Sequence, residues 1–213
     1  MAVVFLDIDG TLLKGTSCEV ELFTILFNKG LIGPGQVLNY LFFALRYWPK
    51  YGENVLKKNK AYLNGLSVAD VEAAGSRLAK EKLPGHFNPR MMERLEMHKQ
   101  AGDRLVLLSG SPDFIVKHIA SVLGVGDLIA ARLAASKGRF INALPELHPF
   151  GMEKVRLAEE FCRTHGQKMT ETVAYADSIS DLPLLEKVGR AVAVTPDGKL
   201  ERIARVRNWE IIN

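Results

Sequence analysis

The chain has 213 residues, of which 47% are hydrophobic and 24% are charged. This composition excludes intrinsic disorder as the main state, because so much apolar surface can build a core. The length corresponds to about 1.4 domains of ~150 residues, which permits one domain with a large insertion or two small domains. The net charge of +4 is weak evidence for nucleic-acid binding and suits a small anionic substrate equally well.

Neither the cysteines nor the first residues indicate secretion. Cys18 and Cys162 are too few for a disulfide framework and form no CxxC pair. Asp7 and Asp9 interrupt the first apolar run, which lacks a basic region before it, so we expect no signal peptide. The longest uncharged stretch, 30–45, is shorter than the ~20 apolar residues of a membrane-spanning helix. We therefore expect a soluble, cytoplasmic protein without stable membrane association, and the sequence leaves its oligomeric state open.

Short apolar runs rich in β-branched residues alternate with helical patterns along most of the chain. The first run, 2–8, is typical of a strand buried on both faces of a parallel sheet. We expect further strands at 104–109, 127–131, 172–177 and 190–195, and helices at 88–101, 112–124, 151–165 and 180–188. This alternation predicts an α/β fold with an open, parallel, Rossmann-like sheet covered by helices on both faces. A small hairpin around 136–141 is expected to extend that sheet.

The interval between the first two strands is far longer than a single crossover helix. Its first part shows only helical patterning, with helices expected at 17–29, 34–48, 53–63 and 67–82. Pro34 and Ser67 are suitable start signals for two of these helices. We therefore predict an all-helical cap at 16–83, inserted into a core formed by 1–15 and 84–213. The aromatic stretch 41–48 is expected to form the core of this cap, with Arg46 as the first candidate for substrate contact.

Polar residues follow three of the expected strands, at the edge where open α/β sheets bind ligands. They are Asp7 and Asp9 after the first strand, Ser109 and Gly110 after the second, and Asp177 and Asp181 after the fourth. Ser111 has a local explanation as the N-cap of the next helix. Lys154 lies in the first turn of an expected helix, where the helix dipole disfavours a cation unless an anion is near.

Carboxylates that converge at one sheet edge repel one another unless a cation joins them. Oxygen ligands without soft donors suit Mg²⁺, which keeps waters and substrate phosphate in its shell. Lys154, Ser109 and the Gly110 amide would then hold the phosphoryl oxygens. A carboxylate nucleophile, a second carboxylate two residues later, Mg²⁺ and a lysine are the parts needed for aspartyl-phosphate chemistry. The expected partner is a small phosphorylated metabolite and no nucleic acid.

These segments together resemble the haloacid dehalogenase-like hydrolase superfamily, and within it the branch similar to phosphoserine phosphatase. Four motifs carry the resemblance, namely DxDGTL at 7–12, the strand-end Ser109, Lys154, and AD-S-x-S-D at 176–181. They stand in the expected order on the expected elements, and the resemblance covers nearly the whole chain, including the cap. It implies a Mg²⁺-dependent phosphatase that hydrolyses a small phosphate monoester.

The resemblance also implies a role for each site residue. Asp7 attacks phosphorus and becomes the aspartyl-phosphate, while Asp9 protonates the leaving alkoxide and then deprotonates the attacking water. Mg²⁺ would be held by the Asp7 carboxylate, the backbone carbonyl of Asp9 and Asp177. Asp181 would orient Lys154 or a metal-bound water.

Two departures from the family pattern concern serine specificity. The glutamate that phosphoserine phosphatases carry nine residues after the nucleophile is Thr16 here, although Glu19 and Glu21 follow closely. The asparagine of their fourth motif is Ser180. We therefore expect phosphoserine to be a poor substrate compared with another small phosphate monoester. The aromatic and aliphatic cap around Phe42, Phe43, Tyr47 and Trp48, with Arg46 among them, suits an anionic substrate that has an apolar or ring-bearing tail.

Other classes of function stay open to different degrees. A phosphotransferase or mutase would use the same intermediate, and the sequence barely separates it from a hydrolase. A signalling receiver domain lacks a long insertion after its first strand. A non-enzymatic phosphate-binding module is disfavoured because Asp7, Asp9, Lys154 and Asp177 are all present. The five histidines have no metal-ligand spacing and are expected at the surface or in packing.

Overall fold

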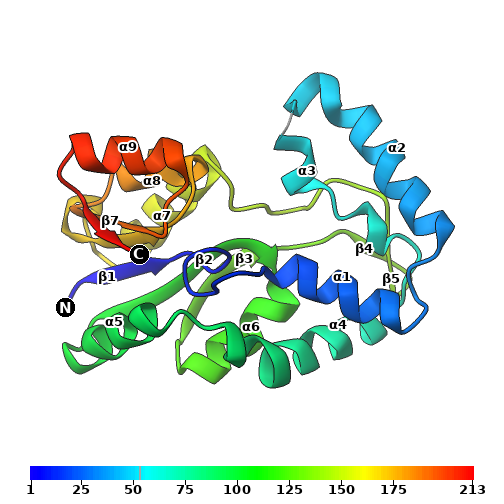
Figure 1. Ribbon diagram of the computed structural model, residues 1–213, viewed down its shortest axis with the longest axis horizontal. Coiled ribbons are helices and arrows are strands. Elements are labelled where there is room, and N and C mark those ends of the chain that lie inside the picture. Colours follow the sequence, from blue (N-terminus) through cyan, green and yellow to red (C-terminus); the bar gives the residue numbers. More distant parts are fainter. Residues whose placement is uncertain (53) are drawn as a thin grey trace.

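The computed structural model describes residues 1–52 and 54–213 (Figure 1). Its centre is a sheet of six parallel strands, in the spatial order β3 (Asp127–Ala131), β2 (Arg104–Pro112), β1 (Val3–Leu6), β6 (Val173–Ala176), β7 (Arg190–Val194) and β8 (Glu210–Ile212). The chain starts in the middle of the sheet, adds β2 and β3 on one side, and then adds β6 to β8 on the other. The strand order therefore reverses between β1 and β6, which is where ligands bind in this class of fold. The predicted α/β fold is confirmed.

Helices cover both faces of the sheet (Figure 1). One face packs against α5 (Pro89–Gln100) and α6 (Asp113–Leu123), and the other against α7 (Met152–Thr164), α8 (Leu182–Leu185) and α9 (Gly198–Val206). Because successive strand residues point to opposite faces, Val4 and Leu6 of β1 belong to the first apolar core, and Val3 and Phe5 to the second.

The helix α9 and the strand β8 are additional to the predicted elements. Asp197 caps the N-terminus of α9, since its Oδ1 accepts hydrogen bonds from the N–H groups of Lys199 and Leu200 at 3.0 and 2.9 Å. The backbone N–H of Asp197 donates to the carbonyl of Asp177 at 2.8 Å, which steadies the segment after β6. The N-cap residue Asp197 is a start signal that can be seen in the sequence. The strand β8 has three residues and is too short to show a periodicity.

In its described residues, the segment predicted to be the cap contains four α-helices, namely α1 (Cys18–Asn28), α2 (Pro34–Tyr51), α3 (Asn54–Lys58) and α4 (Val68–Arg77). Buried residues of α1 and α4, including Leu22 and Val71, belong to the same apolar core as β1. A smaller cluster around Phe43 and Val55 holds α2 against α3. The boundaries of the cap at 16–83 stay a prediction.

Two of the expected cap helices are interrupted. The helix predicted at 53–63 is instead α3 followed by a separate 3-10 turn at Ala61–Leu63. Asn59 ends α3, because its side chain donates to the carbonyl of Tyr40 at 2.8 Å and accepts from the N–H of Ala61 at 3.0 Å. Glu53, the expected first residue of that helix, lies outside the described residues. The helix predicted at 67–82 changes from α to π geometry at Leu78–Lys82.

The expected hairpin is present, but it does not extend the main sheet. Its strands, β4 (Ala135–Ser136) and β5 (Arg139–Phe140), form a separate two-stranded sheet. The N–H of Phe140 donates to the carbonyl of Leu66 at 3.0 Å, and the N–H of Gly65 donates to the carbonyl of Phe140 at 2.8 Å. The hairpin therefore ties the core to the helical segment.

The expectation that 41–48 forms the core of the cap is wrong for most of its side chains. Phe43 is buried, but Leu41, Phe42, Leu45 and Trp48 are 57, 58, 76 and 49% exposed. The side of α2 that contains Phe43 packs against α3 and Ala61, and the opposite side faces outward. In the residues that the structure describes, no helix combines the length and the apolar character needed to cross a bilayer.

Candidate active site

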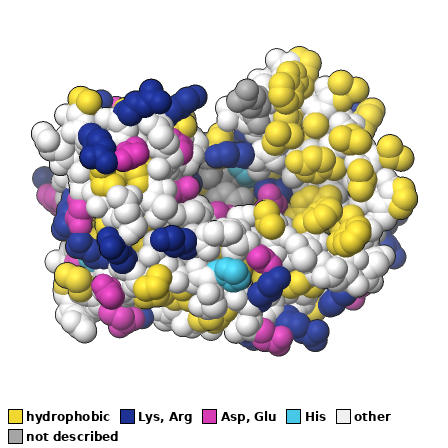
Figure 2. Space-filling view, in the orientation of Figure 1, with side chains coloured by type: hydrophobic (Ala, Val, Ile, Leu, Met, Phe, Trp, Pro, Cys, Tyr) yellow, Lys and Arg dark blue, Asp and Glu magenta, His cyan; other side chains and the backbone are white. Residues whose placement is uncertain are grey.

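A pocket of ≈ 230 Å³ lies where the carboxyl ends of β1, β2 and β6 meet. All seven residues predicted for the site line it, namely Asp7, Asp9, Ser109, Gly110, Lys154, Asp177 and Asp181. In Figure 2 the pocket belongs to the hollow between the sheet-bearing half of the molecule and the helical segment. The structure thus brings together four segments that are far apart in the sequence.

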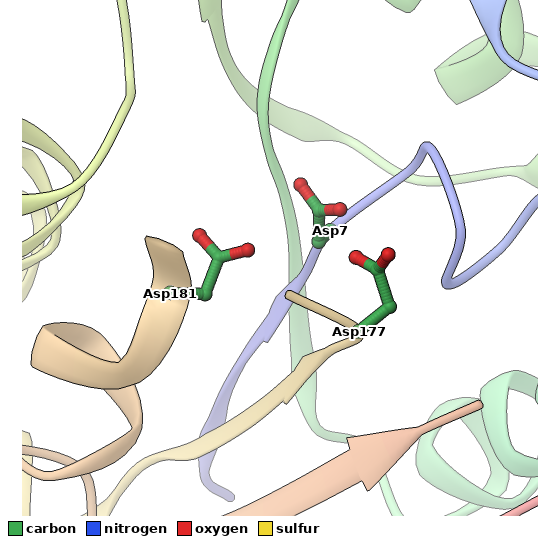
Figure 3. A group of neighbouring side chains, drawn as sticks. All are labelled: Asp7, Asp177 and Asp181. Carbon is green, nitrogen blue, oxygen red and sulfur yellow. The ribbon is translucent and has the colours of Figure 1, made fainter. Parts of the chain in front are cut away.

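Three carboxylates converge in this pocket (Figure 3). One oxygen each of Asp7, Asp177 and Asp181 lies within 4.8 Å of the other two. Asp7 directly follows β1, Asp177 follows the neighbouring strand β6, and Asp181 ends a 3-10 turn at Ile179–Asp181. Asp7 and Asp181 are buried, so these charges are shielded little by water.

Lys154 is the cation among these carboxylates. It is 4% exposed in the first turn of α7, and its Nζ lies 2.6 Å from Asp7 Oδ1. Asp181 Oδ1 lies 2.7 Å from the same Nζ, although outside hydrogen-bond geometry. Burial alone lowers the pKa of Lys154, but the carboxylates of Asp181 and Asp7 outweigh it and raise the pKa above its ordinary value. These two aspartates are the anions that justify a lysine at this helix position.

One ammonium does not balance three carboxylates. Burial raises the pKa of Asp7 to about 8 against the opposing effect of Lys154, and Asp181 and Asp177 add to the rise. Burial and the Asp181 charge raise the pKa of Asp177 to about 6. A divalent cation would relieve this repulsion, and a set of hard carboxylate oxygens fits Mg²⁺. Asp181, predicted to orient Lys154, is placed both to do so and to lie beside such a cation.

The carboxylate of Asp9 has different partners. Its Oδ1 accepts a hydrogen bond from the N–H of Cys18, the first residue of α1, at 2.7 Å, and its Oδ2 accepts one from the hydroxyl of Ser111. The expectation that Ser111 caps the next helix is wrong, because Pro112 is the N-cap of α6. Ser111 is 2% exposed and holds the proposed acid–base residue instead. The backbone carbonyl of Asp9 stays the predicted metal ligand of this residue.

Ser109 and Gly110 lie at an irregularity of β2, where the register with β3 shifts between Leu108 and Pro112. The Ser109 hydroxyl oxygen accepts the N–H of Ser111 at 3.1 Å. A Cβ on Gly110 would lie 3.4 Å from the carbonyl oxygen of Pro149, an ordinary van der Waals contact. Both residues line the pocket, where they are predicted to bind phosphate.

The helical segment contributes side chains that the sequence analysis missed. Lys57 and Lys60 line the pocket, whereas Arg46 is exposed on α2 and stacks 5.7 Å from the ring centroid of Tyr47. The expectation that Arg46 contacts substrate therefore has no support in this geometry. The two lysines, three residues apart in the sequence, were a visible signal of an anion site. Whether their side chains reach the pocket depends on where Asn59 ends α3.

His148 also lines the pocket. It was expected at the surface or in packing, and it is 8% exposed. Burial, with Lys60 and Lys58 nearby, lowers the pKa of His148 to about 3. The imidazole is therefore neutral at physiological pH and offers no positive charge to a phosphate.

The three candidate residues for an ammonium group separate in the structure. The Thr16 hydroxyl donates to Glu21 Oε1 at 2.7 Å, and Glu21 also pairs with Lys82. Glu19 is the one of these three that lines the pocket, and its Oε2 lies 2.5 Å from Lys60 Nζ. Glu21 thus has a structural role, and Glu19 is the carboxylate of the helical segment that faces the site.

Comparison with known proteins agrees with this geometry. The family model of haloacid dehalogenase-like hydrolases matches residues 4–186. The chain belongs to the haloacid dehalogenase-like hydrolase family. The predicted resemblance is confirmed, and so is the prediction that the protein is an enzyme of the hydrolase class.

Individual proteins are similar over almost the whole chain. "Probable phosphatase Rv3661" of Mycobacterium tuberculosis is 34% identical over 98% of this chain and 74% of its own length. "Phosphoserine phosphatase SerB1" of the same species is 28% identical over 99% of this chain and 70% of its own length. A crystal structure of a Bordetella pertussis protein of unknown function has a TM-score of 0.83 at 23% identity and covers 100% of this chain and 98% of its own. Its fold is therefore shared with this chain.

Proposed function

We propose that the protein is a Mg²⁺-dependent phosphatase that hydrolyses a small phosphate monoester through an aspartyl-phosphate on Asp7. The observation that carries the proposal is the buried pair of Asp7 and Lys154 beside two further carboxylates, all of them lining a pocket of ≈ 230 Å³. The names of two similar proteins, a probable phosphatase and a phosphoserine phosphatase, support the same reaction class.

The first half of the reaction uses both acids of the first motif. Lys154 binds Oδ1 of Asp7, which leaves Oδ2 to attack phosphorus while the bond to the ester oxygen breaks. Asp9 gives its proton to the leaving alkoxide, and the hydrogen bonds from Cys18 and Ser111 fix the direction of its carboxyl group. The lysine ammonium also offsets charge on the phosphoryl oxygens in the transition state.

The second half releases phosphate. Asp9, now ionised, removes a proton from water, the water oxygen attacks phosphorus, and the bond to Asp7 breaks. Ser109 and Gly110 would hold the equatorial oxygens of the phosphoryl group. Mg²⁺, held by Asp7, the Asp9 carbonyl and Asp177, would supply Lewis-acid stabilisation of these oxygens when bound.

The finer points of the function belong to the same proposal. The expected substrate is a small phosphorylated metabolite, because the pocket of ≈ 230 Å³ is bordered by Lys57, Lys60 and Lys154. A cytoplasmic setting suits the two unpaired, buried cysteines, Cys18 and Cys162.

Trapping the intermediate tests the proposal. The protein is given a labelled phosphate monoester with Mg²⁺, quenched in acid and mapped by mass spectrometry, with Asp7→Asn as the matched control. We expect label on Asp7 in the native protein, none in the variant, and no turnover after chelation of divalent ions. Label on another residue, or full activity after exhaustive chelation, would contradict the mechanism. Product analysis with an added alcohol distinguishes hydrolysis from transfer, because a phosphotransferase would form a new ester.

A further inference from the structure

A second hollow, here called the cap groove, lies between α1, α2 and α3 and has a volume of ≈ 430 Å³. Most of its lining is apolar or aromatic: Val20, Phe23, Val37, Tyr40, Leu56 and Tyr62. Figure 2 shows apolar side chains gathered over this part of the molecule, beside the hollow that contains the active site. Several of them are unusually exposed, with Val20 at 59%, Val37 at 46% and Leu56 at 47%. Such an apolar concavity is typical of a ligand site.

The cap groove adjoins the active-site pocket through one residue. Glu19 lines both hollows. Its Oε2 pairs with Lys60, which lines the pocket, and its Oε1 accepts a hydrogen bond at 3.3 Å from the hydroxyl of Tyr62, which lines the groove. A ligand whose phosphate lies at Asp7 would therefore pass this polar junction before it reached the apolar walls.

The charges on the two sides of Glu19 differ in a way that fits one kind of molecule. On the pocket side are Lys57, Lys60 and Lys154. On the groove side, the described lining residues other than Glu19 carry no charge. Glu19 is the acidic residue of the groove lining, and its charge is taken up by Lys60. The arrangement matches an anion, then a short polar linker, then an uncharged apolar chain.

We propose that the cap groove binds the apolar chain of the substrate, so that the substrate is a single-chain lipid phosphate. In this class a phosphate monoester is joined through a short polar linker to one alkyl or acyl chain. The inference rests on the proposed phosphatase activity and gives its substrate class. A second copy of the chain is the other occupant to test, because Leu38 and Leu45 on α2 form an exposed apolar ridge outside the groove lining, at 65 and 76% exposure.

Chain length provides a direct readout. Burial of each methylene in an apolar site contributes about fourfold to kcat/KM, so activity should rise with chain length until the groove is full. The probes are monoalkyl phosphates of two to ten carbons, each used below the concentration at which it forms micelles. For the native protein we expect the ratio of kcat/KM for decyl phosphate over ethyl phosphate to exceed ~10².

Two adjacent residues of α2 give a matched pair of variants. Val37 lines the groove and Leu38 lies on the ridge beside it. We expect Val37→Asp to lower the decyl-to-ethyl ratio at least tenfold, because a carboxylate would oppose burial of the chain. Leu38→Asp should leave the ratio and the activity on ethyl phosphate unchanged. Thermal unfolding of both variants checks that they fold.

The outcomes separate the two levels of the proposal. If no alkyl phosphate of the series is hydrolysed, the proposed function fails. If alkyl phosphates are hydrolysed but the decyl-to-ethyl ratio stays near one, or if both variants lower this ratio equally, the cap groove does not bind the alkyl chain. If light scattering shows a native dimer that Val37→Asp and Leu38→Asp dissociate without changing the ratio, a second copy occupies this face and the inference is overturned.

Discussion

A Cβ atom on Gly10 would lie 2.1 Å from Oδ2 of Asp177. Gly10 also has a φ of +85°, a left-handed conformation that other residues adopt only with strain. The glycine between Asp9 and Thr11 therefore lets the turn after β1 approach the carboxylate that follows β6. This close approach places the proposed nucleophile and the proposed metal ligand in one site.

Gly10→Ala tests that relationship. The new methyl group must displace Asp177 or the turn, so we expect Mg²⁺ affinity and activity to fall about 10- to 100-fold. Gly102→Ala is the control, because Gly102 also has a positive φ of +72° but no atom within 4 Å of its would-be Cβ. Titration of activity with Mg²⁺ distinguishes the two variants. Equal effects of both would show that only backbone strain matters.

Lys154→Met removes the buried cation and leaves Asp7 beside Asp181. Breaking a buried ion pair in this way typically costs about 3–5 kcal/mol of unfolding free energy, because the remaining charges lose their partner. We expect that loss in urea unfolding without divalent ions, and a smaller loss with Mg²⁺, since a cation offsets the repulsion. Activity should fall to background. A variant as stable as the native protein would contradict the assigned pairing.

Asp9 and Ser111 act as one unit in the proposed mechanism. Asp9→Asn should slow turnover by at least ~10²-fold, the usual contribution of a general acid–base. Ser111→Ala removes one hydrogen bond to that carboxylate and should lower kcat by roughly 10- to 150-fold, since such bonds contribute about 1.5–3 kcal/mol. Ser121→Ala, on the exposed side of α6, is the control and should change neither. A leaving group of low pKa should rescue Asp9→Asn but not Asp7→Asn.

Asp103, at the opposite end of the sheet from the site, contributes to how the free energy of unfolding changes at acid pH. Its carboxylate accepts the N–H of Ala2 at 2.7 Å and contacts His98 at 2.8 Å. Burial raises the pKa of Asp103, but these two partners outweigh it and lower the pKa below its ordinary value. A lowered pKa means that the ionised form stabilises the fold at neutral pH, and that this contribution is lost as the pH falls through the lowered value.

Asp103→Asn should therefore lower the free energy of unfolding by about 1–3 kcal/mol at pH 7. The difference from the native protein should begin to shrink below the ordinary pKa of ~3.9 and should be lost below the lowered pKa of folded Asp103, where both proteins carry a neutral side chain. Urea unfolding between pH 7 and pH 3 measures it, and kcat should not change. A difference that grows toward acid pH would reverse the assigned sign.

Local pattern predicts the sheet and most of the site, because both depend on short segments. Asp7 and Asp177 lie together in the pocket because each follows an apolar run, and parallel strands bring their carboxyl ends to one edge. Ser111 was misread because its partner, Asp9, is 102 residues away, whereas an N-cap is a local signal.

The helical cap shows even more clearly that local pattern does not predict contacts between residues far apart in the sequence. Which side of α2 is buried depends on Phe43 meeting Val55 and Ala61, and no local rule determines that contact. The sequence alone therefore favours Arg46 for substrate contact and does not single out Lys57 or Lys60. The helix break at Asn59 is likewise set by a distant carbonyl, that of Tyr40.

Phosphoserine gives the last test, and it concerns the charge facing its ammonium group. Thr16 lies outside the pocket lining and donates to Glu21, which already pairs with Lys82. Glu19 faces the site, but its carboxylate pairs with Lys60.

An ammonium group brought to Glu19 would therefore compete with a cation already in place. Losing one partner of a desolvated charge pair typically costs 2–5 kcal/mol, or roughly 30- to 5,000-fold in kcat/KM. We expect kcat/KM for phosphoserine to be at least ~30-fold below that of the best member of a panel of sugar phosphates, glycerol phosphate and alkyl phosphates. Lys60→Gln should narrow the gap, because it frees Glu19 for the ammonium. If phosphoserine leads the panel by tenfold or more, the pairing of Glu19 with Lys60 does not determine specificity.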